Sequence, residues 1–234
     1  MRLDKFFSEC GLLSRTETAA AAKAGEITVN GTVERRRDRH IDPERDTVTF
    51  RGETVRYAKF TYVMLNKPDG YISATEDGNL PVVTSLLPEQ LQRMGLFPCG
   101  RLDKDTLGLL LLTNDGALTH RLLSPKHHAE KVYFFRCASP LSERDVVRMR
   151  EGMMMDGELL KSADLCPAPD GLSGTLTLTE GKYHQVKRMF LLSDNEITFL
   201  ERISFGGVPL DRGLARGEWR YLTEDEIARL HENT

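Results

Sequence analysis

Residues 100–116 read GRLDKDTLGLLLLTNDG, and the rest of the chain can be interpreted outward from them. A polar segment with four charged residues precedes the apolar run Leu109–Thr113, which ends at the turn-forming triplet Asn-Asp-Gly. A short apolar run bounded by turn residues is typical of a buried strand, although periodicity alone does not exclude a helix. The flanking Gly108 and Gly116 favour the strand. The stretch therefore predicts a buried strand entered from a polar loop.

The loop before this strand is where we expect chemistry. A strand fixed in a core holds the adjoining loop rigidly, and reactive side chains are usually presented on such loops. Asp103 is the lead candidate. The alternative is that Asp103 and Asp105 are turn formers whose side chains bond nearby backbone amides, which is common for a single aspartate. Composition does not decide between the two.

Length and composition describe an ordinary globular protein. With 234 residues, 40% of them hydrophobic and 29% charged, the chain can form a sizeable core and a second small domain. No apolar run approaches the roughly 20 residues that a membrane helix needs, and the opening MRLDKFFSECGLLSR lacks the apolar core of a secretory signal. We therefore expect a cytoplasmic protein with no membrane partner.

The cysteines and histidines do not predict a metal site. The four cysteines are widely separated, lack the paired spacing of zinc ligands and indicate reduced thiols. His127 and His128 are adjacent, so on a strand they would point to opposite faces and could not easily share a metal.

The charge distribution is uneven. The net charge of −3 argues against a general polyanion binder. Residues 1–60 carry 12 Lys or Arg against 10 Asp or Glu, a net of +2, and the remainder carries 20 against 25, a net of −5. Any contact with nucleic acid is therefore predicted to centre near the amino terminus.

The first 60 residues predict two helices and a hairpin that is followed by a basic segment. A face with helical apolar spacing opens the chain, and Ser14 with Glu17 forms a capping box before an alanine-rich second helix. The Asn30-Gly31 dipeptide is the strongest short hairpin signal, and residues 47–57 predict a second hairpin. A cluster of arginines follows the first hairpin: Arg35, Arg36, Arg37 and Arg39.

Residues 1–58 resemble the alpha-L RNA-binding domain, a module first seen in a small-subunit ribosomal protein. The stretches RLDKF and GEITVNGTV carry the resemblance. It implies that Arg35, Arg36 and Arg37 contact RNA, because guanidinium groups bind phosphates in a bidentate manner. The alternative is a solvated charged loop on an unrelated module. Nearby acidic residues dilute the patch, so we expect modest, salt-sensitive affinity.

Residues 59–234 contain further motif-like stretches between predicted elements. A strand beginning at Tyr62 ends in NKPDG, a basic loop containing EKVY leads into another strand, and a third strand ends in EGKYHQVKRMF. Prolines 167 and 169 indicate a loop. The other predicted elements are helices over Ala117–Leu123 and Ser142–Gly152, strands Thr175–Leu178 and Ile197–Phe205, and a closing helix capped by Thr223.

In this order, GRLD with KDTLGLLLLTNDG and KYHQVKRMF resemble the signature of the pseudouridine synthases, in the branch that modifies ribosomal RNA and is typified by RsuA. The resemblance spans nearly the whole chain and departs from the usual pattern at Leu107 and Lys182. It implies an α+β protein: an alpha-L domain over residues 1–58 and a catalytic domain over 59–234. The catalytic domain is expected to have a mixed, mostly antiparallel sheet flanked by helices.

The resemblance also implies site residues. Asp103 would be the catalytic carboxylate, acting as nucleophile or proton acceptor, Lys187 would pair with it, and Tyr133 would stack on the target uracil. Residues 66–68 would form a structured turn near the active site. Alternatively, Tyr133 is a core residue, residues 68–70 form a plain Pro-Asp-Gly turn, and the basic residues near 187 are the polar face of a helix. Further RNA contacts are implied for Arg101, Lys67, His184 and Arg188.

The implied reaction is isomerisation of a uridine to pseudouridine, which involves no redox change or phosphoryl transfer and needs no cofactor. The segment SPKHHAEKVY resembles the branch that modifies small-subunit RNA more than the large-subunit branches. The alternatives are a large-subunit enzyme, or a non-catalytic RNA-binding or ribosome-assembly protein. A glycosidase using Asp103 with Asp105 is disfavoured because neighbouring side chains diverge. We expect a monomer whose partner is ribosomal RNA or an assembling ribosomal subunit. The sequence leaves the target nucleotide open.

Overall fold

The structure, a computed structural model, describes residues 1–124 and 129–233. It divides into two compact units, Met1–Thr61 with Leu87–Leu96 and Tyr62–Leu86 with Phe97–Thr234. The predicted basic loop with His127 and His128 lies outside the described residues. Among the residues that are described, every helix is too short or too polar to cross a bilayer.

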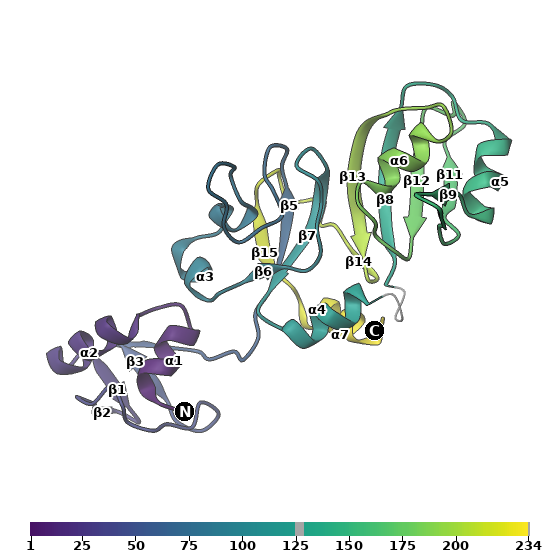
Figure 1. The fold of residues 1–234 in the computed structure, drawn as a ribbon. Helices are drawn as coiled ribbons and strands as arrows, with labels where there is room; N and C mark the ends of the chain where they lie inside the picture. Colours follow the sequence, from purple (N-terminus) through teal and green to yellow (C-terminus); the bar gives the residue numbers. More distant parts are fainter. Residues whose placement is uncertain (125–128, 234) are drawn as a thin grey trace. The chain divides into compact units, whose positions relative to one another are not determined.

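The first unit combines helices with a small antiparallel sheet (Figure 1, purple). The capping box predicted at Ser14 and Glu17 is confirmed, as is the hairpin turn at Asn30 and Gly31, both of which have positive φ. The sheet order is β2-β1-β3-β4. The elements of residues 1–61 are α1 (Leu3–Glu9), α2 (Arg15–Ala24), β1 (Ile27–Val29), β2 (Thr32–Val33), β3 (Val48–Phe50) and β4 (Glu53–Thr54). Helix α3 (Glu89–Arg93) is grouped with this unit.

In the described part of the second unit, nine strands form one sheet. The order is β11-β12-β8-β13-β7-β5-β15, with β14 paired to β13 and β6 to β7. Strands β7 and β13 run parallel and the other described pairs are antiparallel, which confirms the mixed, mostly antiparallel prediction. The strands are β5 (Tyr62–Lys67), β6 (Phe97–Pro98), β7 (Leu107–Thr113), β8 (Lys131–Cys137), β11 (Asp164–Pro167), β12 (Ser173–Leu178), β13 (Ile197–Phe205), β14 (Val208–Pro209) and β15 (Trp219–Tyr221).

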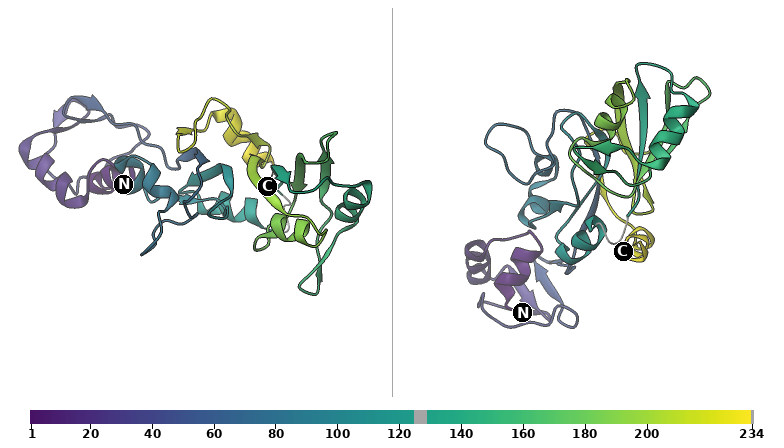
Figure 2. Two further views of the ribbon diagram at one scale, coloured as in Figure 1. Left: turned by 90° about the horizontal axis from the view of Figure 1, so that it is seen from above. Right: turned by 45° about the vertical axis from the view of Figure 1, so that its right-hand side comes forward.

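Helices cover the sheet at two places. The predicted strand Leu109–Thr113 is confirmed as β7, and its buried Leu109 and Leu111 form one core with α4 and α7, which lie side by side (Figures 1 and 2). Helix α6 packs on β8 through Phe190, whose ring centroid lies 4.9 Å from that of Phe135. The remaining elements are η1 (Val83–Leu86), α4 (Gly116–Leu123), α5 (Glu143–Glu151), α6 (Gln185–Leu191), α7 (Glu224–Glu232) and the hairpin β9 (Met154–Met155) with β10 (Glu158–Leu159).

Three segments differ from the sequence prediction. Pro167 ends strand β11 rather than lying in a loop, which is possible because β11 is at the edge of the sheet, where a missing N–H breaks no ladder bond. Residues 219–221 form the edge strand β15, for which no strand was predicted. Asn66 and Lys67 continue β5 instead of forming a turn, and the turn begins only after Pro68.

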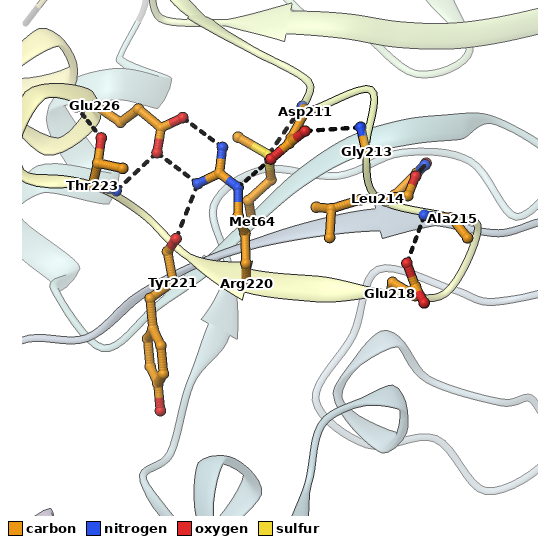
Figure 3. A network of polar contacts seen from close by, with 11 residues as sticks. Met64, Asp211, Gly213, Leu214, Ala215, Glu218, Arg220, Tyr221, Thr223 and Glu226 are labelled. Carbon is orange, nitrogen blue, oxygen red and sulfur yellow. Dashed lines mark hydrogen bonds and ion pairs between the residues drawn. The ribbon is translucent and has the colours of Figure 1, made fainter.

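Arg220 joins β15 to the closing helix (Figure 3). Its Nε donates to Asp211 Oδ2 at 2.6 Å, and its two terminal nitrogens donate to the Glu226 carboxylate at 2.8 and 2.7 Å. Glu226 also completes the capping box with Thr223 at the start of α7. The amide of Asp211 donates to the sulfur of Met64 on β5 at 3.3 Å. One guanidinium fork thereby fixes the carboxyl-terminal segment to the sheet edge.

Gly108 marks the close approach of β7 to β13. Its φ is +96°, and a Cβ at this position would lie 2.4 Å from the carbonyl oxygen of Arg202. Arg202 is also its partner in the parallel pairing. Only glycine fits here, because any side chain meets backbone that belongs to the neighbouring strand.

We predict that Gly108→Ala lowers the free energy of unfolding of the second unit by at least about 3 kcal/mol, because a strained backbone and a clash combine. Urea denaturation followed by the fluorescence of Trp219 measures it, since this is the chain's one tryptophan and it lies on β15. Gly217→Ala is the control: its φ is +86° but a Cβ there meets nothing within 4 Å. It should cost about 1–2 kcal/mol. Equal losses would show that no clash occurs at Gly108.

Candidate active site

Asp103 lies on the loop between β6 and β7, and the backbone on both sides of it is hydrogen-bonded. The Ser73 hydroxyl accepts from the amide of Leu102 and donates to the carbonyl oxygen of the same residue, both at 2.9 Å. The amide of Thr106 donates to the carbonyl oxygen of Asp103 at 3.1 Å and closes a turn. The side chain of Asp103 is 28% exposed. The loop therefore presents a half-buried carboxylate in a fixed position.

Lys67, at the end of β5, supports the same loop from the protein interior. Its side chain is fully buried, and its ammonium group donates to the carbonyl oxygens of Pro68, Lys104 and Thr106 at 3.1, 2.9 and 2.8 Å. Burial lowers the pKa of Lys67 to about 8. The sequence predicted an RNA contact for Lys67. The structure instead occupies all three ammonium donors with backbone oxygens, which gives Lys67 a supporting position.

Helix α6 brings two side chains to Asp103. Lys187 Nζ lies 3.4 Å from Asp103 Oδ2 and 2.5 Å from Asp105 Oδ1. His184 Nε2 lies 3.5 Å from Asp103 Oδ1. Burial opposes ionisation of Asp105, but the hydrogen bond and charge of Lys187 outweigh it and lower the pKa of that carboxyl. The structure thus brings together Asp103, Lys187 and His184, which the sequence motifs placed in one site.

A cavity of about 550 Å³ opens beside Asp103. Tyr133 on β8 lies in its wall with 8% of its surface exposed, and the strand register places it next to Arg202 of β13. Apolar side chains complete this part of the wall: Leu178, Val186 and Leu200. A flat ring with polar edges suits such a cavity, because Tyr133 and the aliphatic groups contact its faces while charged groups lie at its rim.

Arg202 and Lys131 are wall residues that the sequence analysis missed. Arg202 is 1% exposed, its Nε donates to the carbonyl oxygen of Leu109 at 2.8 Å, and its Nη2 is buried without a protein partner among the described residues. Lys131 donates to the carbonyl oxygen of Ala129 at 3.0 Å. Burial and then the charge of Arg202 lower the pKa of Lys131 to about 8. In the sequence, Arg202 could have been noticed as a charged residue inside the predicted strand segment FLERISF.

The other predicted contact residues fall in different places. Arg101 is exposed and lines the cavity together with His184. Arg188 forms an ion pair with Asp156, and Lys182 in the cavity wall forms one with Glu158. Both acidic residues belong to the β9–β10 hairpin. Arg35, Arg36 and Arg37 lie in the first unit, with exposed side chains.

The carboxylates of the wall differ in how they are engaged. Glu180 accepts from the amide of Lys161 at 3.1 Å and from Gln185 Nε2 at 2.7 Å, whereas Asp103 faces the cavity next to two basic groups. Asp103 is therefore placed to act as a nucleophile or as a proton acceptor. Among the described residues, no group of three or more His, Cys, Asp or Glu side chains could hold a metal ion.

We predict that Lys131→Met raises the free energy of unfolding at pH 7, because a buried ammonium disfavours the folded state. The difference should shrink by about 1–3 kcal/mol between pH 8 and pH 10.5. In that range the folded wild-type protein loses the Lys131 proton while the unfolded chain, with a pKa near 10.5, keeps it, so wild-type stability rises relative to the variant. Urea titrations with Trp219 fluorescence measure both proteins.

Lys104→Met is the matched control, since the Lys104 side chain is exposed on the same unit. A difference between wild type and Lys131→Met that stays constant from pH 7 to pH 10.5 would contradict the assignment of a buried, titrating ammonium to Lys131.

The comparisons with known proteins agree on one family. Residues 61–192 match the family described as RNA pseudouridylate synthase. The chain is 45% identical to the uncharacterized RNA pseudouridine synthase YtzG of Bacillus subtilis, over 99% of both sequences. It is 40% identical to ribosomal small subunit pseudouridine synthase A of Pasteurella multocida, over 99% of this chain and 100% of that protein. A crystal structure of a pseudouridylate synthase is similar at a TM-score of 0.69 and 38% identity, covering 98% of this chain and 99% of that one. The protein therefore belongs to the RNA pseudouridylate synthase family, and its resemblance to the RsuA branch is confirmed.

Proposed function

We propose that this protein converts one uridine of small-subunit ribosomal RNA to pseudouridine, with Asp103 as the catalytic carboxylate. The observation that carries the proposal is the position of Asp103, paired with Lys187 at the wall of a cavity that Tyr133 also lines. The proteins named ribosomal small subunit pseudouridine synthase A support the choice of RNA, at 40% identity for Pasteurella multocida and 39% for Escherichia coli.

The reaction breaks the bond from the ribose C1′ to the uracil N1 and forms a bond from C1′ to the uracil C5. The proton on C5 is released and N1 gains one, so atoms and charge balance without an oxidant or reductant. Asp103 can attack C1′ as a nucleophile or accept a proton from the ribose, and both roles require an ionised carboxylate beside the sugar. Lys187, 3.4 Å away, stabilises that negative charge in a half-buried site.

The target base has to leave its stack to reach Asp103. The cavity wall offers Tyr133, almost fully buried on β8, as a face against which the free uracil can stack and turn. Leu178, Val186 and Leu200 line the same cavity and offer apolar contacts to the faces of the base. Binding of the detached uracil through its faces keeps it in place until the new bond forms.

The first unit is proposed to be the alpha-L RNA-binding domain, covering residues 1–58. Its arginines are exposed, and two of them are held by helix α2: Arg35 donates to the carbonyl oxygen of Lys23 at 2.8 Å and Arg37 to that of Arg15 at 3.4 Å. Arginine side chains anchored in this way still present donors to phosphates. The expected partner is ribosomal RNA or an assembling subunit, bound by a monomer in the cytoplasm.

We predict that Asp103→Asn abolishes pseudouridine formation, a loss of at least roughly 10²–10⁴-fold, while RNA affinity is retained. Unmodified small-subunit and large-subunit RNA are incubated with each protein, and pseudouridine is mapped by carbodiimide-dependent reverse-transcriptase stops. Asp105→Asn is the comparison variant. It removes the other carboxylate that contacts Lys187, but this side chain is absent from the described cavity lining and Asp103 stays in place, so it should lose far less activity.

Each outcome of this mapping is informative. A single stop in the small-subunit RNA that is absent with Asp103→Asn supports the proposal. A stop only in large-subunit RNA would keep the chemistry and overturn the choice of RNA. No stop in either RNA, including RNA in partly assembled particles, would overturn the enzymatic proposal in favour of an RNA-binding protein.

A second prediction concerns the first unit. Replacing Arg35, Arg36 and Arg37 with Gln should weaken RNA binding and make its salt dependence shallower. The slope of log K against log[salt] should change by about 0.7–0.9 for each phosphate that the variant no longer binds. The matched control replaces three other exposed arginines of this unit: Arg45, Arg51 and Arg56. Equal effects of the two triple variants would point to general charge rather than to a defined binding surface.

A further inference from the structure

Tyr183 is an exposed aromatic residue in the wall of the active-site cavity. Its exposed fraction is 73%, whereas Tyr133, in the same wall, is only 8% exposed. The ring of Tyr183 is stacked on that of His184, with centroids 3.8 Å apart and planes inclined by 17°. One face of the phenol ring is therefore backed by His184, while most of its surface remains open to solvent.

The local backbone places this pair at the start of helix α6. His184 caps the helix with φ of 50°, in the left-handed region that is uncommon for a residue with a side chain. His184 therefore ends the strand-to-helix connection, and both residues of the pair line the cavity. Backbone strain of this kind clusters at active sites and at segments that bind ligands.

The position of the pair relative to Asp103 identifies the ligand class. His184 Nε2 is 3.5 Å from Asp103 Oδ1, and the Tyr183 ring is stacked on the His184 ring with 3.8 Å between their centroids. A uridine whose ribose lies at Asp103 has its neighbouring nucleotide within reach of Tyr183. Arg101 and Lys182, which line the same cavity, supply positive charge for the connecting phosphates.

We propose that Tyr183, backed by His184, is a second base-stacking position that binds the nucleobase adjacent to the target uridine. The inference rests on the proposed function and extends it: the enzyme would hold two successive bases, one in the cavity and one on its rim. Stacking on an open aromatic face tolerates any base, so this position contributes affinity and register rather than base identity.

The test is a double-mutant cycle on RNA binding. The RNA is a short oligonucleotide around the mapped uridine, intact or with an abasic site at the 5′ or 3′ neighbour, and Kd values are measured in the Asp103→Asn background to prevent turnover. Tyr183→Ala should weaken binding of intact RNA by about 5–150-fold. Tyr183→Ala should not weaken binding of RNA that already lacks the base stacked on Tyr183. For RNA that is abasic at the other neighbour, Tyr183→Ala should weaken binding as much as it does for intact RNA.

Two control variants separate stacking from other roles. Tyr183→Phe keeps the ring and should bind like the parent protein. Tyr221→Ala removes a tyrosine that is 54% exposed on strand β15 and is absent from the described cavity lining, so it should leave binding unchanged. With Asp103 intact, Tyr183→Ala should raise KM and largely preserve kcat, and its melting temperature should match that of the wild type.

The inference would be overturned if Tyr183→Ala and the parent protein bound RNA equally well. It would also be overturned if the effects of Tyr183→Ala and of the abasic site were additive at both neighbouring positions. In either case, pseudouridine formation by the wild-type protein would still uphold the proposed function. Absence of pseudouridine with the wild-type protein on every RNA tested would overturn both. The two failures are therefore distinguishable.

Discussion

The active site depends on one buried cation, the ammonium group of Lys67. The loop that carries Asp103 turns carbonyl oxygens toward the buried Lys67, and carbonyl groups that fold away from water need donors. Lys67 donates to two of these carbonyls, those of Lys104 and Thr106, and also to that of Pro68 in its own strand connection. A hydrophobic residue of the same size would leave all three oxygens without that donor. The lysine therefore fixes the shape of the loop, and the loop fixes the direction of the Asp103 carboxylate.

The site is assembled from segments that are far apart in the sequence. Strands β7, β13 and β8 are neighbours in the sheet, so Gly108, Arg202 and Tyr133 lie in one row across it. The absence of a side chain at Gly108 lets the parallel pair β7 and β13 approach closely, directly after the loop that carries Asp103. Helix α6 then adds Lys187 from the side of the cavity. The sheet thus sets the spacing between the carboxylate and the aromatic wall.

Local signals in the sequence predicted most of the fold and part of the site. Capping boxes, the Asn30-Gly31 turn and the apolar run of β7 are determined by neighbouring residues, and these predictions are confirmed. The motifs named Asp103, Tyr133 and Lys187, which the structure brings to one cavity. Their chemical roles stay predictions. The supporting position of Lys67 and the wall position of Arg202 were not predictable from local patterns, because each depends on backbone contributed by a distant segment. Strand β15 was missed because it is too short to show a period.

Two ion pairs link the β9–β10 hairpin to Lys182 and to Arg188 of helix α6, and they have a consequence for the proposed binding of RNA. Asp156 on Arg188 and Glu158 on Lys182 occupy, in the free protein, cations that a phosphate can bind. A phosphate that displaces such a carboxylate releases a group tethered to the protein rather than a small ion from solution. The displaced carboxylate would stay close to the phosphate and repel it, so a phosphate bound at either cation would gain less than one bound at an unpaired cation.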